Sequence, residues 1–201
     1  LLDADPASNT LSWRWVAGLQ TAGKTYLATA DNIARYTGGR FAPQGLAKVA
    51  TALTEVPIDP PTPIPKPQFY DTHTPTMLLV THEDMNPECF ISGTFRAACV
   101  AAPDSLLWGK KSAQFMQTAA IDTAERIKTH YGCETHIAES LDAASLLQAA
   151  EKAGAKQIIT AYTPVGLVAD ALSKATPILA KSGITLLQPR RSWDSHFWPQ
   201  A

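Results

Sequence analysis

The chain has 201 residues, of which 45% are hydrophobic and 17% are charged, and its formal net charge is −1. This length is enough for one domain or two small ones with a real core. The near-neutral charge gives no global sign of a nucleic-acid-binding surface, although a local basic rim is compatible with it. Three scattered cysteines without Cys-x-x-Cys or Cys/His spacing argue against a disulfide framework or a zinc site and indicate a cytoplasmic setting. The sequence contains no membrane-spanning run and no signal peptide, so no membrane partner is expected. No metal is expected either, because Cys/His metal spacing is absent.

Residues 1–18 hold the densest group of chemically active side chains. If this stretch is helical from Asp5, then Asp5, Asn9 and Trp13 lie one turn apart on the same face. A carboxylate, an amide and an indole in line suit a planar heteroaromatic ligand. Trp15 is rotated away from that face. The alternative is structural, with the Asp-Pro pair starting a helix and the tryptophans filling a core.

The same stretch resembles a known family. Its residues run Asp3-Ala4-Asp5-Pro6-Ala7-Ser8-Asn9 and then Trp13-Arg14-Trp15-Val16-Ala17-Gly18. This pattern is similar, without gaps, to the flavin-binding core of the DNA photolyase/cryptochrome family. Two departures, Leu11-Ser12 in place of a Gly/Asn pair and Arg14 in place of Gln, concern the substrate wall more than the flavin contacts.

The resemblance implies a role for each residue. Asp3 and Asp5 would contact the isoalloxazine ring of FAD, and Asn9 would face the flavin N5. Trp13 would be the flavin-proximal member of the photoreduction chain. Trp15 would line the pocket that receives a flipped pyrimidine dimer. The implied catalytic residues are Asn9 and Trp13, the cofactor-binding residues are Asp3, Asp5 and Asn9, and the substrate-binding residue is Trp15.

The implied activity is that of a deoxyribodipyrimidine photo-lyase, in which reduced FAD transfers an electron under light to repair pyrimidine dimers in DNA. A monomer is expected, and the sequence does not identify an antenna chromophore. Because family FAD sites draw on a longer helical region, the chain is interpreted as a fragment that binds FAD weakly or not at all by itself. Two alternatives stay open, which are a cryptochrome-like blue-light sensor without repair and a non-catalytic α/β binding module.

The organisation predicted along the chain has three parts. Residues 1–55 would form the C-terminal part of a helical FAD-binding domain, with a helix starting at 29–32 and stopped at 37–39, and an apolar helical segment at 45–53. Residues 56–75 would form a Pro-rich linker, because Val56 to Pro67 holds six prolines and favours an extended polyproline II spacer. Recognition of this run by a proline-binding domain is the alternative.

Residues 76–201 are predicted to form a Rossmann-like, three-layer α/β domain. Four apolar strands alternate with amphipathic helices, which favours a parallel sheet with right-handed crossovers. Pro177 is expected to kink or split the last helix. The module is similar to the photolyase antenna domain, which normally precedes the FAD domain, so it would be permuted or duplicated here. The expected strands are 76–80, 134–138, 157–162 and 184–187, and the expected helices are 110–131, 141–153 and 168–182.

Ligands of such sheets bind where the strands end, and two segments follow predicted strands. His82-Glu83-Asp84 could hold a metal or act as an acid or base, and Thr163-Pro164-Val165-Gly166 follows a later strand. A solvated strand end with a helix cap is the favoured alternative, because adjacent side chains of an extended segment point to opposite faces. No Gly-x-Gly-x-x-Gly or P-loop motif is present.

Overall fold

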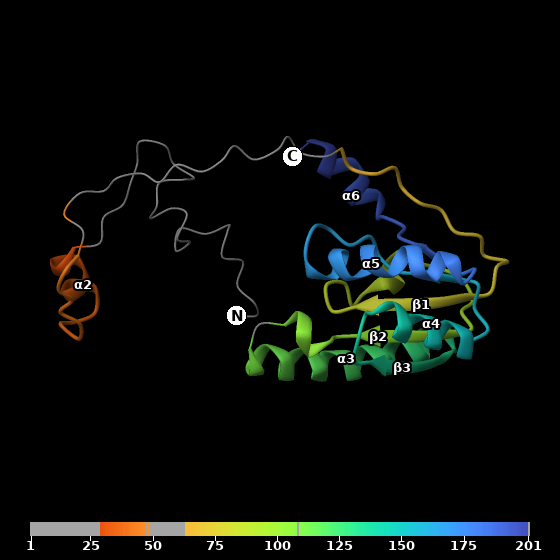
Figure 1. The fold of residues 1–201 in the computed structure, drawn as a ribbon, viewed down its shortest axis with the longest axis horizontal. Helices are drawn as coiled ribbons and strands as arrows, with labels where there is room; N and C mark the ends of the chain where they lie inside the picture. The colour runs from red at the N-terminus through yellow and green to blue at the C-terminus, as the bar shows by residue number, and fades with distance from the viewer. Residues whose placement is uncertain (1–28, 47, 49–62, 108, 201) are drawn as a thin grey trace. The chain divides into compact units, whose positions relative to one another are not determined.

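The computed structural model describes residues 29–46, 48, 63–107 and 109–200 (Figure 1). The chain divides into two compact units, residues 1–62 and 63–201. In the first unit, α2 (Ala30–Tyr36) begins where the sequence predicts a helix start. The Thr29 hydroxyl accepts a hydrogen bond from the backbone N–H of Asn32 at 3.2 Å, which caps the helix. The predicted helical segment at 45–53 lies largely outside the described residues.

The second unit is built on a five-stranded parallel sheet with the order β3-β2-β1-β4-β5. Helices lie on both faces of the sheet, as Figure 1 shows, which confirms the predicted Rossmann-like α/β fold. The strands are β1 (Thr76–Thr81), β2 (Ala97–Ala101), β3 (Glu134–Ala138), β4 (Gln157–Ile159) and β5 (Thr185–Leu187). The helices are α3 (Lys110–Tyr131), α4 (Ala143–Lys152), α5 (Leu167–Lys181) and α6 (Ser192–Phe197), with short 3-10 turns η1 (Pro87–Cys89), η2 (Asp104–Leu106) and η3 (Trp198–Gln200).

The alternation of side chains along β1 divides the core into two layers. Met77 and Leu79 pack with Leu146 of α4 and Leu172 of α5 on one face. Leu78 and Val80, together with Ala98 and Val100 of β2, pack on the other face against Ala120 and Ile127 of α3. Because β1 is buried on both faces, it reads as a continuous apolar run, as central parallel strands do.

Several predicted bounds agree with the structure, and three expectations need correction. The helix Lys110–Tyr131 and the strand Glu134–Ala138 have the predicted bounds. The sheet has a fifth strand, β2, which the sequence pattern did not reveal. The fourth strand ends at Ile159, three residues earlier than predicted. Pro177 lies inside α5 but does not split it, since the helix continues to Lys181.

The described part of the Pro-rich run, from Pro63 onward, has no regular secondary structure and is tied to the α/β module. Arg190 donates from its Nη1 to the carbonyl of Pro65 at 3.0 Å. The backbone N–H of Gln188 donates to the Gln68 side-chain oxygen at 2.6 Å. These contacts bind the run beside the chain segment that leaves β5. In the described part of the chain, no helix has the length and apolarity needed to cross a bilayer.

Candidate functional site

The residues that the photolyase resemblance identifies all lie outside the described residues. They are Asp3, Asp5, Asn9, Trp13 and Trp15. Their roles stay predictions from the sequence. The site described below therefore belongs to the α/β module.

The strand order creates a crevice at the carboxyl edge of the sheet. From β1 the chain moves outward through β2 to β3, and it then returns to the other side of β1 to form β4 and β5. The connections after β1 and β4 therefore leave in opposite directions. Such a switch point is where open α/β sheets bind their ligands.

The structure brings the two sequence-predicted segments together at this point. Glu83 and Asp84, which follow β1, and Thr163 and Pro164, which follow β4, line the same cavity of about 200 Å³. His82 is not among the lining residues, so the predicted His-Glu-Asp group is not presented as a unit. The backbone N–H of His82 instead donates to the carbonyl of Ala101 at the end of β2.

Besides the segments after β1 and β4, a third segment lines this cavity, and sequence reasoning missed it. Arg191, Asp194 and Trp198 reach it from the C-terminal segment that forms α6 and η3. The ring of Trp198 lies near that of Tyr162, with centroids 5.7 Å apart and planes inclined by 57°. The only available signal was the aromatic and charged composition of residues 190–198, which carries no characteristic spacing.

An ion pair holds this C-terminal segment against the loop after β1. The guanidinium of Arg191 bonds both carboxylate oxygens of Asp84. It also donates to the carbonyl of Asn86 at 3.2 Å and lies 4.1 Å from the centroid of the Phe90 ring. The bonds to Asp84 raise the pKa of Arg191 above its ordinary value, so this cation stays charged. Planar paired contacts of this kind fix orientation as well as charge.

Glu83 differs from its neighbour Asp84, because its side chain makes no ion pair or hydrogen bond with any residue that the structure describes. Partial burial raises the pKa of the Glu83 carboxyl above its ordinary value. One of its oxygens lies 3.5 Å from the position that a Cβ would occupy on Gly166, just before α5. The crevice thus holds a carboxylate that has lost part of its water without gaining a cation from the described residues.

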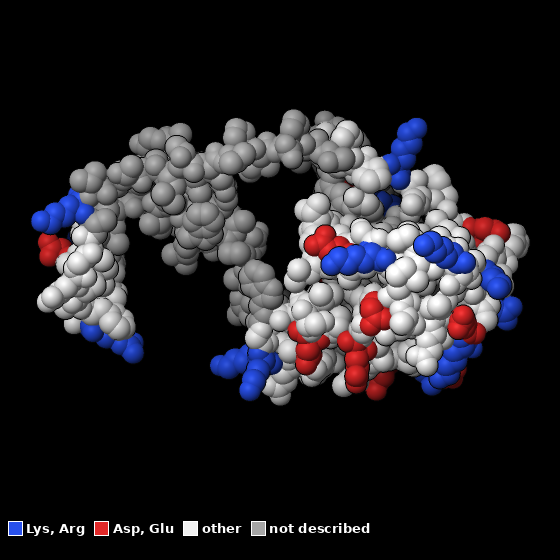
Figure 2. Space-filling model, in the orientation of Figure 1, with Lys and Arg blue, Asp and Glu red and all other residues white. Residues whose placement is uncertain are grey.

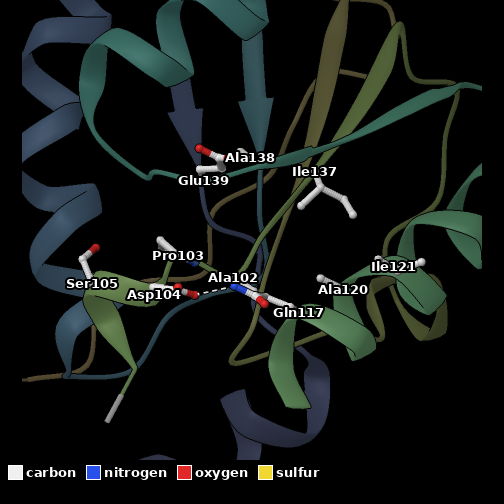
Figure 3. Close-up of a pocket in the computed structure, with 10 residues that line it drawn as sticks. All are labelled: Ala102, Pro103, Asp104, Ser105, Gln117, Ala120, Ile121, Ile137, Ala138 and Glu139. Atoms are coloured by element: carbon white, nitrogen blue, oxygen red, sulfur yellow. Dashed lines mark hydrogen bonds between the residues drawn. The ribbon is translucent and has the colours of Figure 1, made fainter. Parts of the chain in front are cut away.

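A larger cavity of about 600 Å³ opens at the same edge, beyond the ends of β2 and β3 (Figure 3). Its polar side includes Asp104, which accepts a 2.7 Å hydrogen bond from Gln117 of α3. Its apolar side includes Ile121 and Ile137. Sequence reasoning did not find this cavity, because it depends on β2, the strand that the sequence pattern did not reveal.

The described residues show no arrangement of three or more His, Cys, Asp or Glu side chains that could hold a metal ion. Cys99 and Cys133 are buried, and burial raises the pKa of the Cys99 thiol to about 12. Cys99 is therefore a core residue without thiolate chemistry at neutral pH. The crevice offers carboxylates, a fixed guanidinium, hydroxyls and aromatic rings, which suit reversible binding of a small polar ligand.

Comparisons of the chain with protein families, with curated proteins and with solved structures found no match. The class that the geometry defines is a Rossmann-like α/β module with an open carboxyl edge.

Proposed function

We propose that the chain is part of a photolyase-type flavoprotein that repairs pyrimidine dimers in DNA. The observation that carries this proposal is the gapless motif from Asp3 to Gly18, with its paired carboxylates, amide and two tryptophans. Reduced FAD, when bound and excited by light, would supply the electron that splits the dimer and would recover it afterwards. The chain also holds a parallel α/β module, a domain type that the family contains, although in this chain it follows the motif instead of preceding it.

In this proposal, the N-terminal side chains bind and orient while the flavin supplies the electron. Asp3 and Asp5 would hold the isoalloxazine ring of FAD. The side-chain amide of Asn9 would face the flavin N5, where the ring takes up a proton. Trp13 resupplies electrons to oxidised flavin. Trp15 packs against the flipped lesion. The enzyme would be a cytoplasmic monomer with dimer-containing DNA as its partner.

One face of the α/β module is not proposed as the DNA contact. On the face that Figure 2 presents, Lys and Arg side chains are interspersed with Asp and Glu. DNA-binding surfaces instead gather positive charge, because affinity comes largely from neutralised phosphates. The proposal assigns DNA recognition to the flavin-binding region, where Trp15 would contact the lesion.

The visible absorption spectrum of the purified protein, with any native upstream sequence included, tests the proposal. Flavin bands that bleach under blue light with reductant are expected. Asn9→Ala and Asp5→Ala should weaken them, and Trp13→Phe should slow photoreduction. Trp193→Phe is the matched control, because Trp193 is an exposed indole on α6 and should leave photoreduction unchanged. A folded protein without flavin bands would contradict the proposal.

Repair and signalling are separated by a lesion assay. A photolyase should bind and, under light, restore an oligonucleotide with a cyclobutane dimer, and Trp15→Ala should reduce that affinity. A cryptochrome-like sensor would show flavin photoreduction without preference for the lesion.

A second candidate, a non-catalytic binding module, is favoured by a specific observation. Two cavities of about 200 and 600 Å³ open at the carboxyl edge of the sheet, where α/β proteins bind small molecules. A colourless, folded protein that binds a small ligand at this edge would support the second candidate over repair.

A further inference from the structure

The crevice between β1 and β4 has a size that limits its occupant. Its volume is about 200 Å³. Pockets for drug-sized ligands and cofactors are larger, at about 300–1,000 Å³. The crevice is therefore smaller than a pocket that encloses a nucleotide or a flavin, and its residues are separate from those that the flavin proposal names.

The charges that line the crevice are predominantly negative. Its carboxylates belong to Glu83, Asp84 and Asp194, and its one lining cation, Arg191, is committed to Asp84. Neither Glu83 nor Asp194 has a cationic side chain as an ion-pair partner in the described part of the chain. An anionic ligand would meet two uncompensated carboxylates, whereas a cation would compensate both.

The aromatic wall favours an organic cation over a hydrated inorganic one. Trp198 and Tyr162 present two rings inclined at 57° at the same cavity, and indole faces attract cations best. The Arg190 guanidinium already lies 5.4 Å from the centroid of the Tyr162 ring, so Trp198 is the ring without a cation partner among the described residues. The described residues offer no three-ligand metal cluster. A compact ion with an apolar shell fits these groups.

We propose that this crevice binds a small organic ammonium ion, with the carboxylates of Glu83 and Asp194 as counter-charges and Trp198 as the aromatic wall. The Arg191–Asp84 pair is a positioning element, because it fixes the segment that carries Asp194 and Trp198 against the loop after β1. Binding is reversible and involves no covalent step.

Choline and its uncharged isostere 3,3-dimethylbutan-1-ol test the charge requirement on the unaltered full chain. Titrations followed by ¹H–¹⁵N correlation NMR should give saturable shifts at residues 83–84, 161–163 and 191–198 with choline. The neutral isostere should bind at least about tenfold more weakly, because it loses the attraction of the carboxylates and the indole. Equal affinity for the two compounds, or no saturation by choline into the high millimolar range, would overturn the proposal.

Variants locate the site. The double variant Glu83→Gln with Asp194→Asn should raise the Kd for choline about tenfold. Glu139→Gln is the matched control, because Glu139 lines the larger cavity at the same edge and should leave the Kd unchanged. An equal effect of the control variant would contradict the assignment. If the double variant fails to fold, the comparison of choline with its isostere on the unaltered chain still decides the question.

Discussion

Replacing Arg191 with Met should destabilise the α/β module because it breaks the ion pair that fixes α6. The guanidinium bonds both oxygens of Asp84, donates to the carbonyl of Asn86 and lies 4.1 Å from the centroid of Phe90. The side chains of Arg191 and Asp84 are only 28% and 21% exposed. Methionine keeps an unbranched apolar chain but removes the charge and every donor.

The expected loss can be bounded from these contacts. Hydrogen bonds to charged groups contribute about 1.5–3 kcal/mol, and a cation over an aromatic ring contributes about 0.5–1 kcal/mol at a partly exposed site. Solvent screening reduces the total, because neither partner is fully buried. We expect Arg191→Met to lower the free energy of unfolding by about 2 kcal/mol. In a double-mutant cycle with Asp84→Asn, the coupling energy should be about 1–2 kcal/mol.

Urea unfolding followed by far-ultraviolet circular dichroism gives the required free energies. The matched control is a second cycle on Lys128 and Glu134, whose charged atoms are 3.8 Å apart and whose side chains are 59% and 86% exposed. That exposed pair should show a coupling energy below about 0.5 kcal/mol. Equal coupling in the two cycles would refute the view that partial burial and paired geometry make the Arg191–Asp84 contact the stronger one.

Three further predictions concern the core, the crevice and a helix end. Leu172→Ala should lower the free energy of unfolding by about 2–5 kcal/mol, because Leu172 is fully buried. Ile178→Ala in the same helix should lower it by less than about 1 kcal/mol, because Ile178 is 50% exposed. Similar losses would contradict the assigned faces of α5. Burial raises the folded-state pKa of Glu83, so ionisation of this carboxyl costs stability as pH rises. Glu83→Gln should therefore stabilise the protein at pH 7, by less than about 1 kcal/mol after solvent screening. This gain should vanish as the pH falls below 4.5, the ordinary pKa of the carboxyl. Destabilisation at pH 7 would argue against this desolvation. Gly132 ends α3 with a φ of 63°, so Gly132→Ala should destabilise the protein by about 1 kcal/mol and lower its thermal midpoint. Gly132→Asn should lower the midpoint less, because Asn tolerates this backbone conformation better. An equal drop for both variants would contradict a purely conformational cause.

Local pattern predicted the elements whose own residues carry a clear signal of their structure. The helix Lys110–Tyr131 shows apolar residues at helical spacing and ends at a glycine, so its bounds could be read directly. The strand Thr76–Thr81 is a compact apolar run between polar segments and was also identified. In both cases, the residues carry the periodicity or composition of the structure that they form.

The strand that the sequence pattern missed shows the opposite case. β2 has the sequence Ala-Ala-Cys-Val-Ala, and alanine has little intrinsic preference for strands. It is extended because it pairs with β1 on one side and with β3 on the other, and its small side chains are fully buried between the helical layers. Those partners lie far away in the sequence, so a local window contains no sign of them.

By itself, the sequence determined the alternation of strands and helices, the parallel α/β class and a family-like motif near Asp5 that supports a flavin proposal. The tertiary structure decided the strand order, and with it the crevice where the segments after β1 and β4 meet. It also decided that Arg191 and Trp198 belong to that crevice, although they lie more than a hundred residues from Asp84 along the chain. The physical reason is that hydrophobic periodicity acts over a few residues, whereas a binding crevice is formed by side chains that only the packed sheet brings together.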